Sequence, residues 1–444
     1  MMPGKGDFTN CDGVKVQKRY LNDYMHNLHA KFRAENPEIN VSRSVFCRRR
    51  PAHIFPTSFT SRHTCLCQHH QNMSLKLRGI KACGIKVTTN PDTFIKENST
   101  DGQGLHDIVS ALPATVKYSQ WKRVEDADGK KKMKIVSFEV RKEEFATTLR
   151  EDIQKFSEHV ARVKTQYDQL KKLKDRLPEN HAIVQMDFAE NYTCQSNEEV
   201  QSAYWNASMV TLHPAVAYMQ STDGKMEHNS RVFVSDELGH NAGTVFAILK
   251  KLLSEMKLAS PNLTHVHYYT DSPTSQYRNK TIFYIISKHK SLFGVSASWN
   301  YFEAGHGKGP CDGVGGSVKR MADEAVRQQK VIIQDASDFF SWTQQYMSAS
   351  SVSFTFVSQQ DCKAAQQEIE AFGDIKTVTG TMKIHAVASL QDHEQAEVIA
   401  RETSCYCEQC FSNGVFSVDS PCKWKRHLLK EFQTTGKVMH YAPD

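Results

Sequence analysis

Three aspartates occupy positions in this chain that are suited to phosphate chemistry. Asp187 follows the apolar run AIVQM, Asp271 follows HVHYYT, and Asp312 lies in the glycine-rich stretch GHGKGPCDGVGG at 305–316. A glycine-rich turn at the start of a helix presents backbone N–H groups that suit a phosphate. An acidic residue there would repel a phosphate unless a cation lay between them. The pattern therefore indicates metal-assisted phosphate chemistry.

Carboxylate oxygens favour Mg2+ or Mn2+ as ligands, and two such ions in one site can activate a water or a 3′-hydroxyl for phosphoryl displacement. We predict that Asp187, Asp271 and Asp312 hold these ions and are catalytic. His306 and Lys308 stand in the same stretch and are predicted to contact the phosphate or the scissile group. This set predicts nuclease or strand-transfer chemistry without a small-molecule cofactor.

Three residues are candidates for the third metal ligand. Asp312 ranks first because it sits at the junction of the loop and a helix, beside possible phosphate donors. Glu324 ranks second, about three turns into that helix, and Glu303 ranks third because it lies within the preceding strand. Each aspartate alone has a structural explanation, such as a helix N-cap for Asp312.

The elements that must position these residues lie in region 181–330. Three apolar strand patterns come first, and two further strands then alternate with three helical patterns. The order βββαβαβα combines an antiparallel meander with helical crossovers, as in the ribonuclease H-like fold. We therefore predict a mixed α/β chain in which the three aspartates converge at one edge of the sheet.

Twelve cysteines occur in the chain, several of them in close clusters, and metal binding explains such clusters better than disulfides do. In RHTCLCQHHQNM, we predict a structural zinc site with Cys65, Cys67 and His70, and with Cys47 as fourth ligand. Cys83 is an alternative fourth ligand. Buried free thiols are the competing explanation.

A second cysteine group, in SCYCEQCFSNGVFSVDSPCKWKRH, gives the stronger zinc prediction because four thiols fall within 18 residues. Its predicted ligands are Cys405, Cys407, Cys410 and Cys422. The adjacent basic residues make this segment a candidate contact for nucleic acid.

The net charge of +7 is concentrated in the N-terminal region. From Met1 to Lys81 there are 14 Lys and Arg against 5 Asp and Glu. A helix, a turn at Asn36-Pro37 and a second short element are expected there, followed by Arg48, Arg49 and Arg50. This pattern predicts DNA binding, with a small structural lobe as the alternative.

Region 143–178 reads as one long amphipathic helix, since apolar residues recur at threes and fours without Gly or Pro until Pro178. Its spacing permits a coiled coil in a homodimer, but a helix packed along its own domain is the preferred interpretation. No apolar run approaches a membrane span, and no secretory signal is recognised, so we expect an intracellular protein.

The chain accordingly divides into five predicted regions. They are a basic DNA-binding region with zinc at 1–90, a linker with a hairpin at 91–142, the long helix at 143–178, a catalytic domain at 181–330 and an α+β region with the cysteine-rich segment at 331–444.

Four motifs resemble a family of transposon-derived proteins. They are MDFAENY at 186–192, WNASMVTLHP at 205–214, YYTDSPTSQYRNK at 268–280 and GHGKGPCDGVGGSVKR at 305–320. The similarity runs from about Tyr20 to SCYCEQC. The resemblance implies a transposase with an acidic triad of the DDE/D type, matching the three aspartates. One departure is Ser272, where the family usually has Gly after the second aspartate.

The resulting expectation is a nuclear, transposase-like protein that cleaves DNA phosphodiester bonds and transfers strands, either within a mobile element or in domesticated form. Two alternatives stay open. One is a catalytically inactive DNA-binding or chromatin protein that retains the transposase fold, and the other is a structure-specific nuclease of the same fold.

Overall fold

The computed structural model describes residues 8–11, 13–17, 19–20, 25–55, 67–98, 103–126, 128–196, 206–221, 223–348, 350–390, 396–412, 414–416 and 421–430. The chain forms two compact units, Met1–Leu66 and Cys67–Asp444. Among the described residues, no helix is both long and apolar enough to cross a bilayer.

The described residues of the first unit form two helices and two short pairs of strands. Phe32 of the first helix packs against Phe46 of the second, with ring centroids 5.3 Å apart. The predicted helix, turn and second element are confirmed here. The elements are β1 (Phe8–Cys11), β2 (Val14–Gln17), β3 (Arg19–Tyr20), α1 (Met25–Glu35), α2 (Arg43–Arg48) and β4 (Ile54–Phe55).

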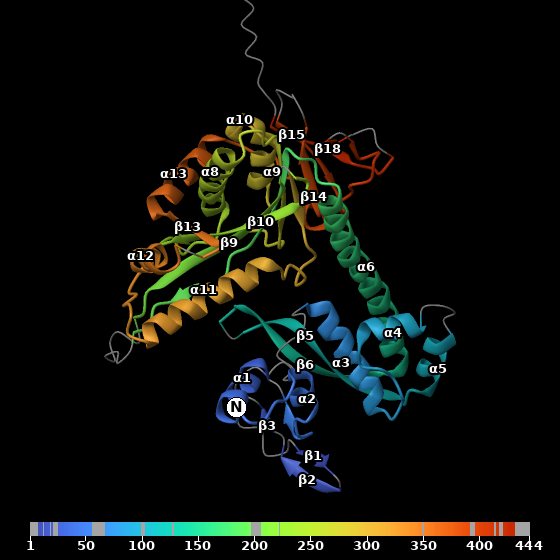
Figure 1. Ribbon diagram of the computed structural model, residues 1–444. Coiled ribbons are helices and arrows are strands. Elements are labelled where there is room, and N and C mark those ends of the chain that lie inside the picture. Colours follow the sequence, from blue (N-terminus) through green and yellow to red (C-terminus); the bar gives the residue numbers. More distant parts are fainter. Residues whose placement is uncertain are drawn as a thin grey trace, which may run out of the picture. The chain divides into compact units, whose positions relative to one another are not determined.

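The second unit is built on a ten-stranded mixed sheet with the order β13-β10-β9-β7-β11-β12-β14-β15-β18, in which β8 also pairs with β9 (Figure 1). The strands are β7 (His181–Met186), β8 (Tyr192–Thr193), β9 (Met209–Gln220), β10 (Met226–Ser235), β11 (His265–Thr270), β12 (Ser296–Tyr301), β13 (Val352–Val357), β14 (Ala386–Ser389), β15 (Ala396–Arg401) and β18 (Lys425–Lys430).

The centre of this sheet has the predicted topology. β7, β9 and β10 form an antiparallel meander, and β11 and β12 then run parallel to β7 on its other side. The spatial order β10-β9-β7-β11-β12 is that of a ribonuclease H-like core, so the predicted fold class is confirmed. Strands from the chain after residue 331 extend the same sheet at both edges, because β13 pairs with β10 and β14 pairs with β12.

Helices cover both faces of the sheet, and successive strand residues alternate between them. Ala182 and Val184 of β7 pack in the core with α8 (Ala242–Ala259) and α9 (Lys280–Ser287). Ile183 packs on the opposite face with the end of α6 (Lys142–Asp175). Figure 1 shows α8, α9 and α13 on one side of the sheet and α11 on the other. The helices are α8 (Ala242–Ala259), α9 (Lys280–Ser287), α10 (His289–Phe293), α11 (Pro310–Arg327), α12 (Ala336–Tyr346) and α13 (Gln359–Ala371), with a 3-10 turn η2 (Thr381–Lys383).

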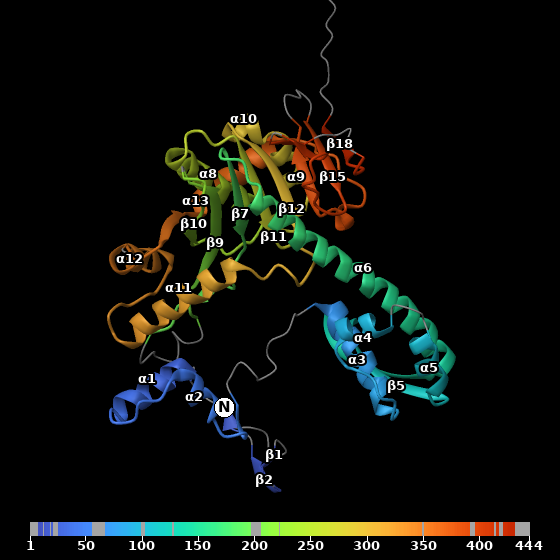
Figure 2. The same ribbon diagram turned by 45° about the vertical axis from the view of Figure 1, so that its right-hand side comes forward.

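The long predicted helix is α6 (Lys142–Asp175), 34 residues or roughly 50 Å in length, which runs from the sheet to a smaller lobe (Figure 2). Its first half packs with that lobe through Phe145, Leu149 and Phe156, and its second half packs under the sheet through Leu170 and Leu173. The helix therefore uses its apolar residues within its own unit, as preferred from the sequence.

The described part of the lobe consists of three helices and the predicted hairpin. Its elements are α3 (Gln68–Ala82), α4 (Pro91–Asn98), α5 (Gln103–Ala111), β5 (Thr115–Glu125) and β6 (Lys131–Arg141). The cysteine-rich segment adds the two-stranded pair β16 (Phe411–Ser412) and β17 (Val415–Phe416), which packs against the second half of α6.

Candidate metal centres

The three predicted aspartates stand at one edge of the central sheet. Asp187 follows β7 and Asp271 follows β11, and because these strands are parallel neighbours their carboxyl ends lie side by side. Asp312 lies in the first turn of α11. The charges of Asp271 and Asp312 both act on the carboxyl of Asp187, so the three carboxylates are electrostatic neighbours at this edge, which we call the acidic pocket. Their oxygens are not grouped as closely as the ligand atoms of the two clusters described below, which lie within 4.8 Å of one another.

The electrostatics of this acidic pocket favour a bound cation. Burial, reinforced by Asp271 and Asp312, raises the pKa of Asp187 to about 7. Burial also raises the pKa of Asp271, although the Ser272 N–H and Arg278 oppose the shift. One carboxylate oxygen of Asp271, Oδ1, is buried and has no hydrogen-bond partner among the described residues. Grouped carboxylates with an unpartnered oxygen fit a hard divalent cation such as Mg2+ or Mn2+.

The neighbourhood of the acidic pocket favours Asp312 over the two alternative ligands. Asp312 Oδ2 accepts a hydrogen bond from the Gly309 N–H at 2.9 Å, which fixes the carboxylate at the start of α11. Glu324 is exposed and accepts a hydrogen bond from Gln328 at 2.9 Å. Glu303 is held elsewhere, because its carboxylate contacts His159, Arg162 and His385.

The loop between β12 and α11 runs along the acidic pocket. A Cβ atom on Gly307 would lie 2.9 Å from Asp271 Cβ, so the backbone passes directly over that aspartate. Lys308, predicted to contact phosphate, is exposed on this loop. His306 influences Asp271 electrostatically, but its imidazole belongs to a separate cluster.

That cluster joins four side chains, Cys67, His70, His159 and His306, whose candidate ligand atoms all lie within 4.8 Å of one another. Burial opposes ionisation of Cys67, but hydrogen bonds with His159 and His306 lower the pKa of its thiol to about 3. Two of the four residues, Cys67 and His70, come from the zinc site predicted from the sequence. Of the other two predicted ligands, Cys65 lies outside the described residues and Cys47 belongs to the first unit.

The second predicted zinc site is assembled as expected. Cys405, Cys407, Cys410 and Cys422 present four sulfur atoms within 4.8 Å of one another, and these thiols can hold zinc. The N–H of Cys410 points back to the carbonyl of Cys407 at 3.0 Å, which forms a tight turn between these ligands. Burial raises the pKa of Cys405 to about 12, whereas the N–H of Cys410 and neighbouring thiols overcome the effect of burial on Cys407 and lower its pKa to about 7.

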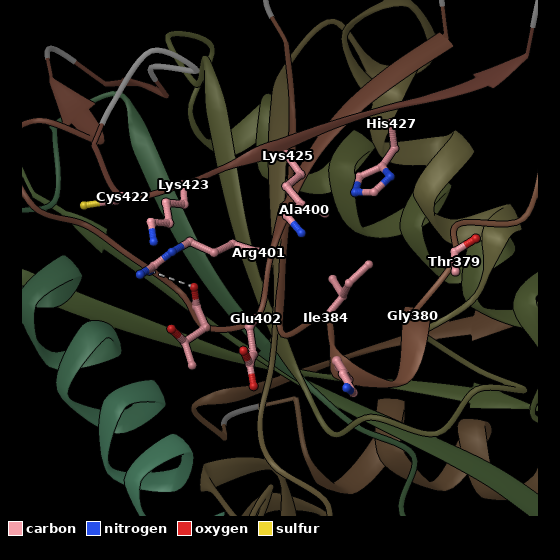
Figure 3. Close-up of a pocket in the computed structure, with 12 residues that line it drawn as sticks. Thr379, Gly380, Ile384, Ala400, Arg401, Glu402, Cys422, Lys423, Lys425 and His427 are labelled. Carbon is pink, nitrogen blue, oxygen red and sulfur yellow. Dashed lines mark hydrogen bonds between the residues drawn. The ribbon is translucent and has the colours of Figure 1, made fainter. Parts of the chain in front are cut away.

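A basic pocket of about 630 Å3 opens beside this cysteine cluster. Figure 3 shows Arg401, Lys423 and Lys425 from β15 and from the segment that leads into β18, together with Cys422. Lys383 and His427 also line the pocket, and Glu402 is its only acidic lining residue among those described. Such a concentration of cationic groups suits a polyanion.

The contact between His159 and His306 could not be predicted from the spacing of residues in the sequence. His159 lies 92 residues after Cys67 and 147 residues before His306, so only the fold brings them together. One signal was available, because His159 falls between Phe156 and Val160 on the apolar stripe of the long helix. A histidine at such a position either packs in the core or binds a ligand, and the sequence does not indicate which residue it contacts.

Comparisons with known proteins find matches to two family models, and neither model has a known function. Residues 166–404 match the model of a domain of unknown function, DUF8701, and residues 1–58 match another, DUF8699. No curated protein matched. Among solved structures, the crystal structure of the Mos1 mariner paired end complex with Mn matched at 9% identity over 79% of this chain and 86% of that chain, with a TM-score of 0.20. A TM-score this low does not establish a common fold.

Proposed function

This chain belongs to the family of the domain of unknown function DUF8701, and we propose that it is a metal-dependent enzyme acting on DNA. Its reaction would be cleavage of DNA phosphodiester bonds followed by strand transfer, as in a transposase. The proposed metal ligands are Asp187, Asp271 and Asp312.

The observation that carries this proposal is the acidic pocket itself. Three carboxylates from separate parts of the chain act on one another, and Asp271 Oδ1 is buried without a partner in the described part of the chain. Repulsion between such groups costs stability unless protons or cations relieve it. Bound Mg2+ or Mn2+ would supply the activation of a water or a 3′-hydroxyl and the stabilisation of a leaving oxygen.

Exposed cationic residues would bind the DNA, whereas the buried Arg278 would position Asp271. Lys308, exposed on the loop beside the acidic pocket, is suited to a phosphate contact. Arg278 acts on Asp271, and its Nε is buried with no hydrogen-bond partner among the residues described. The basic pocket beside the cysteine cluster offers a second anionic contact surface. A substrate of genomic DNA would require the protein to work in the nucleus.

The test is a cleavage assay with Mg2+ or Mn2+ on linear DNA from both sides of the gene, including any terminal inverted repeats found there. We expect Asp187→Asn and Asp271→Asn to abolish metal-dependent cleavage while retaining DNA binding. Asp374→Asn, a change of an exposed aspartate after α13, should cleave normally. Undiminished cleavage by either pocket variant would refute the assignment.

The same experiment separates the alternative functions. A wild-type protein that binds DNA and divalent ions but never cleaves would be a non-catalytic DNA-binding protein. Cleavage of branched DNA without preference for the terminal repeats would identify a structure-specific nuclease.

A further inference from the structure

The cluster of Cys67, His70, His159 and His306 has the composition and closeness of a metal site. Cys67 Sγ lies 3.2 Å from His159 Nε2, which in turn lies 3.0 Å from His306 Nε2. A tetrahedral zinc ion with ordinary Zn–N and Zn–S bonds separates its ligand atoms by about 3.3–3.6 Å. Only small adjustments would therefore place an ion between these atoms.

Hydrogen bonding outside the cluster orients a lone pair of His159 inward. His159 Nδ1 lies 3.0 Å from Glu303 Oε1, so in the neutral ring this nitrogen donates and Nε2 presents a lone pair. That lone pair faces both a thiol sulfur and another imidazole nitrogen. A carboxylate that holds the remote nitrogen of a histidine is the usual outer partner of a zinc ligand.

His70 also has a carboxylate outside the cluster, at a distance longer than a hydrogen bond. Its Nε2 lies 3.7 Å from Asp92 Oδ1, whereas its Nδ1 is buried and has no hydrogen-bond partner in the part of the chain that the structure describes. An unpartnered buried nitrogen is costly, and a metal ion would relieve that cost. Glu303 is itself fixed by Arg162 at 3.1 Å and by His385 at 2.6 Å, so the outer carboxylate is rigidly placed.

The four residues come from three parts of the second unit that pack together at this point. Cys67 and His70 stand at the start of α3, His159 lies in α6, and His306 lies in the loop after β12. Gly305 has φ +78, and a Cβ atom on it would lie 2.9 Å from Cys67 Cα, so the loop backbone is in close contact with the start of α3. Tyr167 of α6 donates a hydrogen bond to the His306 carbonyl at 2.6 Å.

We propose that Cys67, His70, His159 and His306 bind one Zn2+ ion, which fixes the loop between β12 and α11 beside the acidic pocket. Four protein ligands leave no position for substrate, so the ion is structural. The loop continues from His306 to Gly307, which lies against Asp271, and then to Gly309, which binds Asp312. Zinc thereby holds the smaller lobe and α6 against the segment that shapes the acidic pocket.

The first test is the zinc content of the full chain, measured by mass spectrometry after removal of loosely bound metal. We expect two zinc ions per wild-type chain, one in each cluster. His159→Gln and Cys410→Ser should each retain one, and His106→Asn, which changes an exposed histidine of α5, should retain both. One zinc per wild-type chain that Cys410→Ser removes and His159→Gln keeps would overturn the proposal.

Cobalt substitution keeps the test decisive if a variant folds poorly. His159→Gln should retain the intense thiolate-to-cobalt absorption of the four-cysteine site, which reports that the C-terminal part is folded. Glu303→Gln leaves all four ligands in place and should weaken zinc binding about 10–100-fold in chelator competition. Unchanged affinity in Glu303→Gln, with His159→Gln still holding two ions, would refute the site. Zinc content is independent of DNA cleavage, so this result and the proposed function can fail separately.

Discussion

At the scale of single residues, the third ligand of the acidic pocket can be decided by a pair of substitutions. Asp312 raises the pKa of both other aspartates, whereas Glu324 is exposed and bonded to Gln328. We expect Asp312→Asn to reduce metal-dependent cleavage by more than the roughly 100-fold that changes outside the first ligand shell can cost.

Glu324→Gln is the matched control, because it removes one carboxylate from the same helix. Cleavage rates within about twofold of wild type are expected for it, as for most surface changes away from a site. The reverse ranking, with Glu324→Gln inactive and Asp312→Asn active, would assign the third position to Glu324.

The aspartates were predictable because their positions follow from chain order alone. Once a buried strand has been assigned its place in the sheet, the residue that follows it is located as well. This holds for Asp187 and Asp271. The zinc ligands His159 and His306 were not predictable as a pair, since their meeting depends on where α6 packs. The partners of Glu303 were hidden for the same reason, because Arg162 and His385 come from distant elements.

At the scale of elements, the position of the loop between β12 and α11 is limited by the close approach of the Gly307 backbone to the side chain of Asp271. A Cβ atom on Gly307 would meet Asp271 Cβ at 2.9 Å and Cγ at 3.0 Å. Gly307→Ala should therefore displace Asp271 or the loop, destabilise the protein by about 1–3 kcal/mol and weaken Mn2+ binding. Thermal unfolding and Mn2+ titration measure both effects.

Gly316→Ala is the control for this prediction. Gly316 lies inside α11, where an added Cβ atom would meet no described atom within 4 Å. Alanine is favoured over glycine in a helix interior by up to about 1 kcal/mol, so this variant should be slightly more stable. Equal behaviour of the two variants would contradict the close approach over Asp271.

Buried histidines on strand β11 and on the adjacent helix α10 make the stability of the fold depend on pH. His265 and His267 are buried on it, and His289 contacts Tyr268 on the same strand. Burial lowers the pKa of His289 to about 4, so the folded chain leaves it neutral while the unfolded chain binds a proton below about pH 6.5. Stability should therefore be complete above pH 6.5 and fall as the pH drops towards 4.

For His289 alone, the loss at pH 5 amounts to about 2 kcal/mol. His289→Gln removes the hydrogen bond with the Val295 carbonyl and should lower stability at pH 7.5, but it should lose about 2 kcal/mol less than wild type between pH 7.5 and pH 5. Urea unfolding at the two pH values measures this difference. An unchanged pH dependence would show that His289 does not contribute to it.

The elements of the central fold were predictable to the extent that their apolar patterns were long. The meander, its crossover helices and α6 all have such patterns, and the strand order followed from simple connection rules. The edge strands were harder, because β14 has four residues and β13 pairs in parallel with β10 across more than 110 residues of chain. Nothing local in those segments specifies the neighbour.

At the scale of the whole molecule, α6 connects the two cysteine-containing clusters. His159 in its middle belongs to the first cluster, and Gln169 near its end accepts a hydrogen bond from the Tyr406 N–H within the second cysteine segment at 2.7 Å. Gln166 likewise binds Ser404 and the Tyr301 carbonyl at the end of β12. One helix therefore links the smaller lobe, the sheet and the cysteine-rich segment, which explains why its polar residues are buried at these positions.

The charge of the whole chain leads to a prediction for the first unit, which holds much of the N-terminal basic excess. Arg48 and Arg49 are exposed at the end of α2. If they neutralise DNA phosphates, replacing both by Gln in the full chain should reduce the slope of log affinity against log salt concentration by about 0.9 for each phosphate that is no longer neutralised. Fluorescence anisotropy across a salt series measures this slope.

Lys330→Gln with Lys363→Gln removes the same charge from exposed positions of the second unit, and we expect it to change the slope less. Equal slopes for all three proteins would show that Arg48 and Arg49 bind no phosphate.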